Sequence, residues 1–184
     1  MEGHSGSGVE CSNDQDFICM NKISHDSETP AHGQQVTTVC AFIHHDFGGV
    51  EKVFLPKRAE TKKFLPGVYE LPGGHIESED LKGELKREIA EEFGMKINVG
   101  DVFWGFAYRN RVKGSLSTEI IYFAKFIDPI ENIKLNSEDH SEYSWFAEDE
   151  INKAANDLKP ESDLEFEAIR KGFELLKGNK LHFG

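Results

Sequence analysis

A helix predicted over residues 79–93 is the feature that most constrains this chain, because one of its faces must be buried. Four large apolar residues recur at every fourth position and form one stripe along it: Leu81, Leu85, Ile89 and Phe93. Ser78 precedes the helix as the predicted N-cap, and Gly94 follows it as the residue that ends it. Such a helix needs an apolar surface, and flanking segments with the composition of strands supply one.

Another face of this helix carries carboxylates where a helix selected only for stability would avoid them. Glu84, Glu88 and Glu92 follow one another at intervals of four residues, and Glu91 lies three after Glu88. Like charges at this spacing cost about 0.2–0.5 kcal/mol per pair. Anions near the C-terminus of a helix cost a further ~0.3–1 kcal/mol each. A hard dication bound to these carboxylates would reverse the effect, so the pattern predicts a site for Mg²⁺, with Mn²⁺ as a substitute.

The segment from Gly73 to Met95, GGHIESEDLKGELKREIAEEFGM, resembles the Nudix box. It matches the family pattern G-x5-E-x7-R-E-U-x-E-E-x-G-U at every fixed position, where U is a bulky apolar residue. The resemblance extends over about residues 35–177, including Leu71-Pro72 before the box and Glu142–Phe146 after it. It implies the Nudix α/β/α sandwich and hydrolysis of a nucleoside diphosphate linked to another moiety.

The resemblance also implies a role for each matching position. The residues that would hold the divalent cation are Glu88, Glu91 and Glu92, with the backbone carbonyl of Gly73 or Gly74. Arg87 would pair with Glu79 and orient the catalytic glutamates. A surface ion pair without a catalytic role is the alternative for Arg87 and Glu79. The two glycines would permit close approach of the backbone.

Two further groups of residues are candidates for the site. The general base is either Glu88 or Glu91 within the box, or Glu138 or Asp139 in the loop before Trp145, and among the loop residues we favour Glu138. The residues expected to bind substrate phosphates or a terminal group are Arg58, Gly74, Arg109 and Arg111.

The rest of the chain predicts one α/β domain with a mixed sheet flanked by helices. The strands are expected at residues 36–44, 52–57, 96–108, 117–127 and 143–146. Further helices are expected near residues 148–156 and 162–177. Residues 1–33 are rich in Gly, Ser, Asn, Asp and His and are interpreted as a flexible N-terminal arm, which leaves 34–184 as the hydrolase domain.

Net charge and hydropathy indicate which classes of binding partner to expect. With 33 Asp and Glu against 21 Lys and Arg the net charge is −12, so no nucleic-acid partner is expected. No apolar run reaches the roughly 18–20 residues of a membrane span, and no signal peptide is evident, which favours a cytoplasmic protein without membrane contact. The sequence leaves open whether the protein forms a homodimer.

The predicted activity is therefore that of a Mg²⁺-dependent pyrophosphohydrolase of the MutT-like type. Its expected substrate is a nucleoside triphosphate, normal or oxidised, cleaved to the monophosphate and pyrophosphate. The alternatives are an ADP-ribose or sugar-nucleotide pyrophosphatase, removal of pyrophosphate from RNA 5′ ends, and a Nudix-like domain that binds a nucleotide and regulates a partner without catalysis.

Overall fold

A mixed β-sheet forms the centre of the molecule in the computed structural model, which describes residues 31–155 and 163–178. Its strands are β1 (Gln35–Asp46), β2 (Glu51–Arg58), β3 (Gly73–His75), β4 (Ile97–Asn110), β5 (Ser115–Phe126) and β6 (His140–Ala147). Five of them run in the order β4-β5-β1-β2-β6, and β3 pairs with β1 off this path. The β1–β5 pair is parallel, whereas every other pairing is antiparallel.

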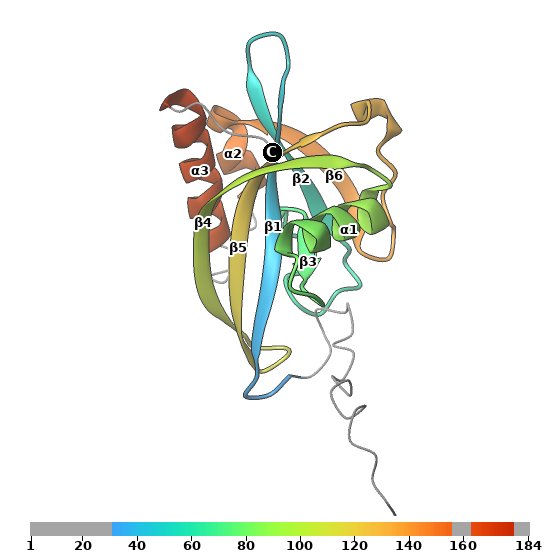
Figure 1. Cartoon of the computed structure of the whole chain (residues 1–184), viewed down its shortest axis with the longest axis vertical. Coiled ribbons are helices and arrows are strands. Elements are labelled where there is room, and N and C mark those ends of the chain that lie inside the picture. The colour runs from blue at the N-terminus through green and yellow to red at the C-terminus, as the bar shows by residue number, and fades with distance from the viewer. Residues whose placement is uncertain (1–30, 156–162, 179–184) are drawn as a thin grey trace, which may run out of the picture.

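Helices cover both faces of the sheet, as Figure 1 shows. The helical segments are α1 (Leu81–Phe93), η1 (Ile130–Asn132), η2 (Glu148–Glu150), α2 (Ile151–Ala154) and α3 (Asp163–Gly178). Helix α1 lies on one side of the sheet, and α2 and α3 lie on the other. The predicted α/β fold with a mixed sheet between helices is thus confirmed. Across residues 31–155 and 163–178, the helices are too short or too polar to span a membrane.

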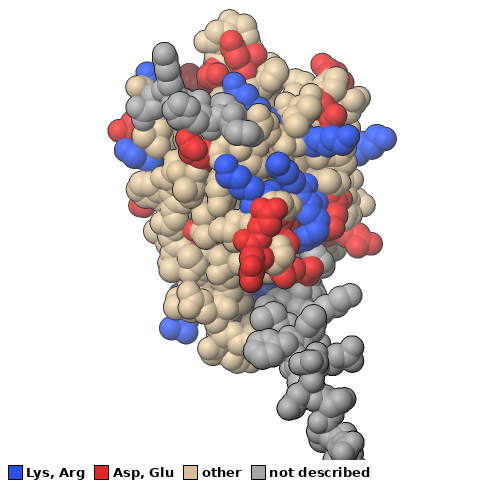
Figure 2. Space-filling view, viewed as in Figure 1, with Lys and Arg blue, Asp and Glu red and all other residues tan. Residues whose placement is uncertain are grey.

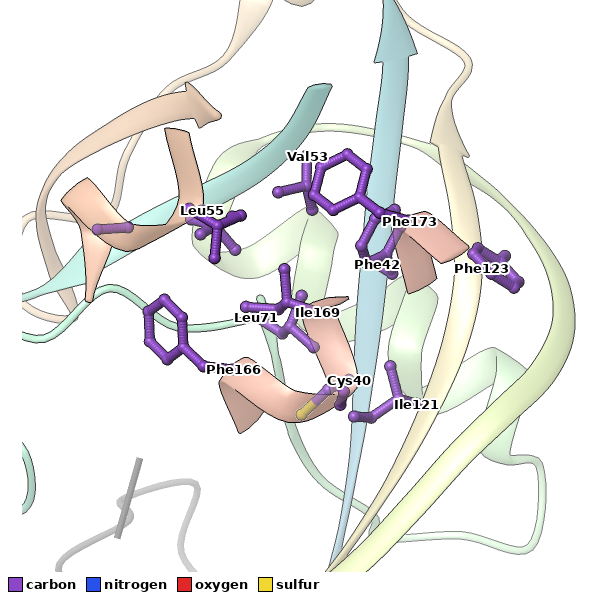
Figure 3. Close-up of a cluster of buried hydrophobic side chains, with 13 residues drawn as sticks. Cys40, Phe42, Val53, Leu55, Leu71, Ile121, Phe123, Phe166, Ile169 and Phe173 are labelled. Carbon is purple, nitrogen blue, oxygen red and sulfur yellow. The ribbon is translucent and has the colours of Figure 1, made fainter. Parts of the chain in front are cut away.

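Strand β1 serves two hydrophobic cores because its side chains alternate between the faces of the sheet. Cys40 and Phe42 join the core under α3, where Phe166, Ile169 and Phe173 pack (Figure 3). The β1 residues of opposite orientation and the α1 stripe form the other core, which includes Val39, Ala41, Ile43, Leu85, Ile89 and Phe93. The four-residue period of the α1 stripe therefore corresponds to real burial.

Strand β3 and the first residue of α1 differ from the prediction. The three residues of β3 are too few for a periodic signal, and their pairing with Thr38–Cys40 of β1 is a tertiary contact. Asp80, not Ser78, is the N-cap of α1, since its side chain accepts the N–H of Gly83 at 3.0 Å. The helix accordingly begins two residues later than the sequence indicated.

Most of the predicted arm, residues 1–30, lies outside the described residues. Ala31 is buried, and its N–H donates to the carbonyl oxygen of Lys113 at 2.9 Å. The N–H of Gly33 donates to the carbonyl oxygen of Gly114 in the same β4–β5 turn. The last residues assigned to the arm thus lie against the domain.

Candidate functional site

Helix α1 presents the glutamates of the box because both of its ends and its apolar face are fixed. Asp80 caps the start, and Gly94 ends the helix in the left-handed region at φ 63°. Leu85, Ile89 and Phe93 are fully buried. The acidic residues between them are therefore held at the edge of the sheet, beside β3.

The glycines of β3 allow two close approaches. A Cβ at Gly73 would overlap the Val39 carbonyl oxygen of β1, so any side chain there would separate the strands. A Cβ at Gly74 would overlap the carboxylate of Glu88. The backbone of Gly73 thus closely approaches Val39, and that of Gly74 closely approaches Glu88, as predicted for both glycines.

Arg87 connects the acidic residues of α1 to β3. Its guanidinium donates to Glu84 at 2.7 Å, to Glu88 at 2.9 Å and to Glu91 at 3.0 Å. It also donates to the carbonyl oxygen of His75 at 3.2 Å. Partial burial lowers the pKa of Arg87, but the bonds to Glu84 and the charge of Glu88 more than offset this and raise it above its usual value.

The partner predicted for Arg87 occupies a different place. Glu79 is exposed at the bend before α1. Because α1 begins at Leu81, Glu79 does not share a helical face with Arg87. Glu84, three residues before Arg87, takes the position expected of Glu79.

Glu92 holds an unsatisfied oxygen. Its Oε2 is buried and has no hydrogen-bond partner among the described residues. Burial raises the pKa of Glu92 well above its usual value, and the charges of Glu70, Glu88 and Asp139 add to the effect. An anionic group in this state is stabilised by a cation.

These carboxylates fit a divalent metal ion, although they do not yet converge on one point. In the described parts of the chain, no three His, Cys, Asp or Glu side chains are already arranged as a metal site. Glu88 and Glu91 are turned toward Arg87, whereas Glu92 is left without a partner. Hard oxygen donors and an unpaired buried carboxylate are suited to Mg²⁺ or Mn²⁺.

A cavity extends from Glu88 and Glu92 across the sheet. Its lining near α1 and β3 is Gly73, Gly74, His75, Glu88 and Glu92. Farther along, it is lined by the charged residues Arg58, Lys62, Glu70, Asp139 and His140 and by the aromatic residues Phe64, Phe106 and Tyr108. The rings of Phe64 and Tyr108 stack at 5.9 Å with an interplanar angle of 12°. The cavity therefore joins an acidic end to an end with aromatic walls.

The cations of the cavity are paired with carboxylates. Arg58 donates to both carboxylate oxygens of Glu70, at 3.1 and 3.0 Å, and to the carbonyl oxygen of Phe64. Lys62 lies 2.7 Å from Asp139. Arg58 thus lies in the cavity, as a substrate-binding residue requires, and it also buttresses the wall that holds Phe64.

Three other predicted site residues lie away from this cavity. Arg109 and Arg111 are exposed near the β4–β5 turn and are not among its lining residues. Glu138 is exposed as well, whereas its neighbour Asp139 lines the cavity. Figure 2 shows basic side chains gathered over the region of α1, directly beside acidic ones.

Two carboxylic acids in the cavity, in addition to the Arg58 partner Glu70, escaped the sequence reasoning. Glu119 of β5 lies 3.9 Å from the sulfur of Cys40, and burial together with the charge of Glu70 raises its pKa to about 7. Glu165 of α3 is buried and accepts the N–H of Leu71. A signal was present in each case, because each is an acidic residue within a predicted apolar strand or helix face.

Comparison with known proteins identifies the family to which the chain belongs. The family model for the NUDIX domain matches residues 34–166. A nucleoside triphosphatase NudI from Salmonella newport is 30% identical over 126 residues, which are 64% of this chain and 86% of that protein. An 8-oxo-dGTP diphosphatase from Buchnera aphidicola is 45% identical over only 47 residues, 25% of this chain and 35% of that protein.

A solved structure shows the same fold at lower identity. The crystal structure of a MutT protein from Methanosarcina mazei superposes with a TM-score of 0.61 at 23% identity, covering 83% of this chain and 99% of that chain. The box on α1, the α/β/α sandwich and the family model agree, and the chain is therefore a member of the Nudix family and a hydrolase of phosphoanhydride bonds.

Proposed function

We propose that this protein is a Mg²⁺-dependent nucleoside triphosphate pyrophosphohydrolase, acting on normal or oxidised nucleotides. The observation that carries the proposal is that one cavity is lined both by Glu88 and Glu92 of α1 and by the stacked pair of Phe64 and Tyr108. A triphosphate fits the acidic, metal-binding end, and a planar base fits against aromatic rings. The name of the NudI relative supports the same substrate class.

Glu88, Glu91 and Glu92, with the carbonyl oxygen of Gly73, are the residues proposed to hold the metal. When bound, Mg²⁺ supplies neutralisation of phosphate charge and a lowered pKa of water. Arg87 binds Glu88 and Glu91 through one guanidinium, so it fixes the positions of both carboxylates relative to each other. Glu79 is the predicted partner of Arg87, and Glu84 is the better supported one because it accepts the shortest bond.

In the overall reaction, water adds to phosphorus and the P–O bond that bridges the α- and β-phosphates breaks. The attacking water loses a proton to a carboxylate, and pyrophosphate leaves with the bridging oxygen. Among the loop residues, the sequence favours Glu138 as the general base. Asp139 has more support, because its carboxylate lines the cavity and is kept in place by Lys62 and by Asn136 at 2.7 Å.

Binding of the substrate is assigned to the cavity walls. Arg58 and Gly74 lie there, and the Gly74 backbone adjoins Glu88. Arg109 and Arg111 are proposed only for a part of the substrate that projects beyond the cavity. The cytoplasmic location, the lack of a nucleic-acid partner and the homodimer remain predictions.

The test is a substrate panel with Mg²⁺: the nucleoside triphosphates, 8-oxo-dGTP, ADP-ribose, sugar nucleotides, dinucleoside polyphosphates and capped RNA. Products are separated by anion-exchange chromatography. We expect a nucleoside monophosphate and pyrophosphate from one or more triphosphates, and a rate at least 100-fold lower for the Glu92→Gln variant. Exclusive cleavage of ADP-ribose or sugar nucleotides would replace the triphosphate assignment, and binding without any cleavage would favour the regulatory alternative.

A further inference from the structure

Lys113, in the turn between β4 and β5, is completely buried, although it lies outside the residues that line the cavity. A lysine is almost never fully buried unless its ammonium group is paired, because desolvation of the charge is costly. The Nζ atom of Lys113 lies 2.9 Å from Nε2 of His75, which is itself only 7% exposed. One partner of this buried ammonium group therefore belongs to β3, next to the glycines of the box.

The turn that carries Lys113 is built to direct its side chain inward. The side-chain oxygen of Asn110 accepts the N–H groups of Val112 and Lys113, at 3.0 and 2.9 Å. Gly114 follows in the left-handed region at φ 74°. Ala31 covers the turn from outside through its bond to the Lys113 carbonyl oxygen. These contacts fix the backbone of the turn from which the Lys113 side chain reaches His75.

His75 connects Lys113 to Arg87 of α1. Its ring meets Lys113, whereas its backbone carbonyl oxygen accepts a bond from Arg87 at 3.2 Å. The same Arg87 nitrogen, Nη2, donates to Glu84 and Glu88. A continuous series of bonds therefore leads from the β4–β5 turn to the carboxylate of Glu88.

We propose that Lys113 is a positioning residue, which fixes His75 and through it the Arg87 guanidinium that orients Glu88 and Glu91. An ammonium group has three donors and no acceptor, so Nε2 of His75 must be the acceptor. The imidazole is then fixed as the tautomer with its proton on Nδ1. The catalytic part of this inference rests on the proposed function, whereas the tautomer does not.

The first test is the ¹⁵N spectrum of the His75 ring in the full chain, assigned by comparison with a His75→Gln variant. We expect the wild-type protein to show the Nδ1–H tautomer and Lys113→Met to lose it. A wild-type ring protonated on Nε2 would overturn the inference. This measurement needs neither substrate nor metal, and its wild-type part stands even where Lys113→Met does not fold.

The second test separates positioning from simple stabilisation of the hairpin. For Lys113→Met we expect kcat to fall about tenfold while KM stays within about twofold. The matched control is Lys86→Met, the same substitution at an exposed position of α1, which should leave both constants unchanged. Lys113→Arg, which keeps a donor, should recover part of the lost kcat.

A lower melting temperature for Lys113→Met with unchanged kcat would show a purely structural lysine and overturn the inference. Should Lys113→Met not fold, the same comparison applies to His75→Gln, whose shorter amide should likewise reduce kcat more than it changes KM. A wild-type protein that hydrolyses no member of the panel would instead refute the proposed function and leave the tautomer result intact.

Discussion

The carboxylate of Glu88 occupies the space that a side chain at Gly74 would need. A glutamate on α1 and a glycine of β3 are therefore matched in shape, although fourteen positions separate them in the sequence. Gly74 is not one of the glycines with positive φ, so its backbone accepts alanine without strain.

The first prediction follows from this match. Gly74→Ala should push the Glu88 carboxylate aside and lower kcat/KM by at least tenfold, because the added methyl group meets only the end of a flexible side chain. The melting temperature should fall by only a few degrees. Steady-state kinetics and thermal denaturation measure the two effects. Gly178→Ala, whose added methyl group would meet nothing, is the control, and full activity of Gly74→Ala would contradict the role of Glu88.

Asp139 and Glu138 offer a comparison between adjacent carboxylates. Because Asp139 lines the cavity and Glu138 is exposed, Asp139→Asn should reduce kcat by 100-fold or more and Glu138→Gln by less than threefold. The reverse order of the two variants would restore Glu138 as the base.

Metal binding should be visible in the stability of the protein. At a hundredfold excess of Mg²⁺ over its dissociation constant, linkage predicts about 2.7 kcal/mol, or a rise in melting temperature of roughly 5–10 °C for a domain of this size. Glu88→Gln/Glu92→Gln should abolish this rise. The control is Glu131→Gln/Glu167→Gln, two exposed positions, which should keep it. An equal rise in all three proteins would place the metal elsewhere.

Glu119 predicts a dependence of stability on pH. Burial raises its pKa in the folded protein to about 7, above its unfolded value, so the folded state binds more protons between these two values. The stabilisation is present below the unfolded pKa and is lost as pH rises to about 7. For an isolated group it amounts to as much as about 3 kcal/mol.

Urea denaturation at pH 5 and pH 8 measures this effect. Glu119→Gln should lose less stability than the wild-type protein over the same interval. Glu167→Gln, an exposed acid on α3, should behave like the wild type. The prediction would be contradicted if the free energy of unfolding of the wild-type protein changed from pH 5 to pH 8 by the same amount as that of Glu119→Gln.

The sequence predicted those parts of the molecule whose signals are local. The stripe on α1 repeats every turn, and β1 and β5 each contain a continuous apolar run, so their type and approximate bounds could be inferred. The box predicted the glutamates and the glycines because their spacing is fixed along one helix and its entry. Gly73, Gly74, Glu88 and Glu92 line one cavity in the structure, whereas Glu79 and Glu91 are exposed and are not among its lining residues.

Residues brought in from distant segments could not be predicted in the same way. Glu119 and Glu165 reach the cavity from β5 and α3, and only the pairing of β5 with β1 and the packing of α3 bring them near Cys40. Arg109 and Arg111 have the charge that phosphate binding needs, but both are exposed and only Asn110 between them lines the cavity. A sequence shows which residues are charged, whereas the direction in which a charged side chain points depends on the tertiary fold.

The bond between Glu165 and the N–H of Leu71 has a consequence for the C-terminal helix. Leu71 stands two residues before Gly73, so α3 secures the strand on which the box begins. Proteolytic removal of α3 would therefore do more than uncover apolar surface. It would free one anchor of the catalytic loop, and inactivation should precede global unfolding. The last helix thus supports the entry to the candidate site through Glu165 and also covers the sheet.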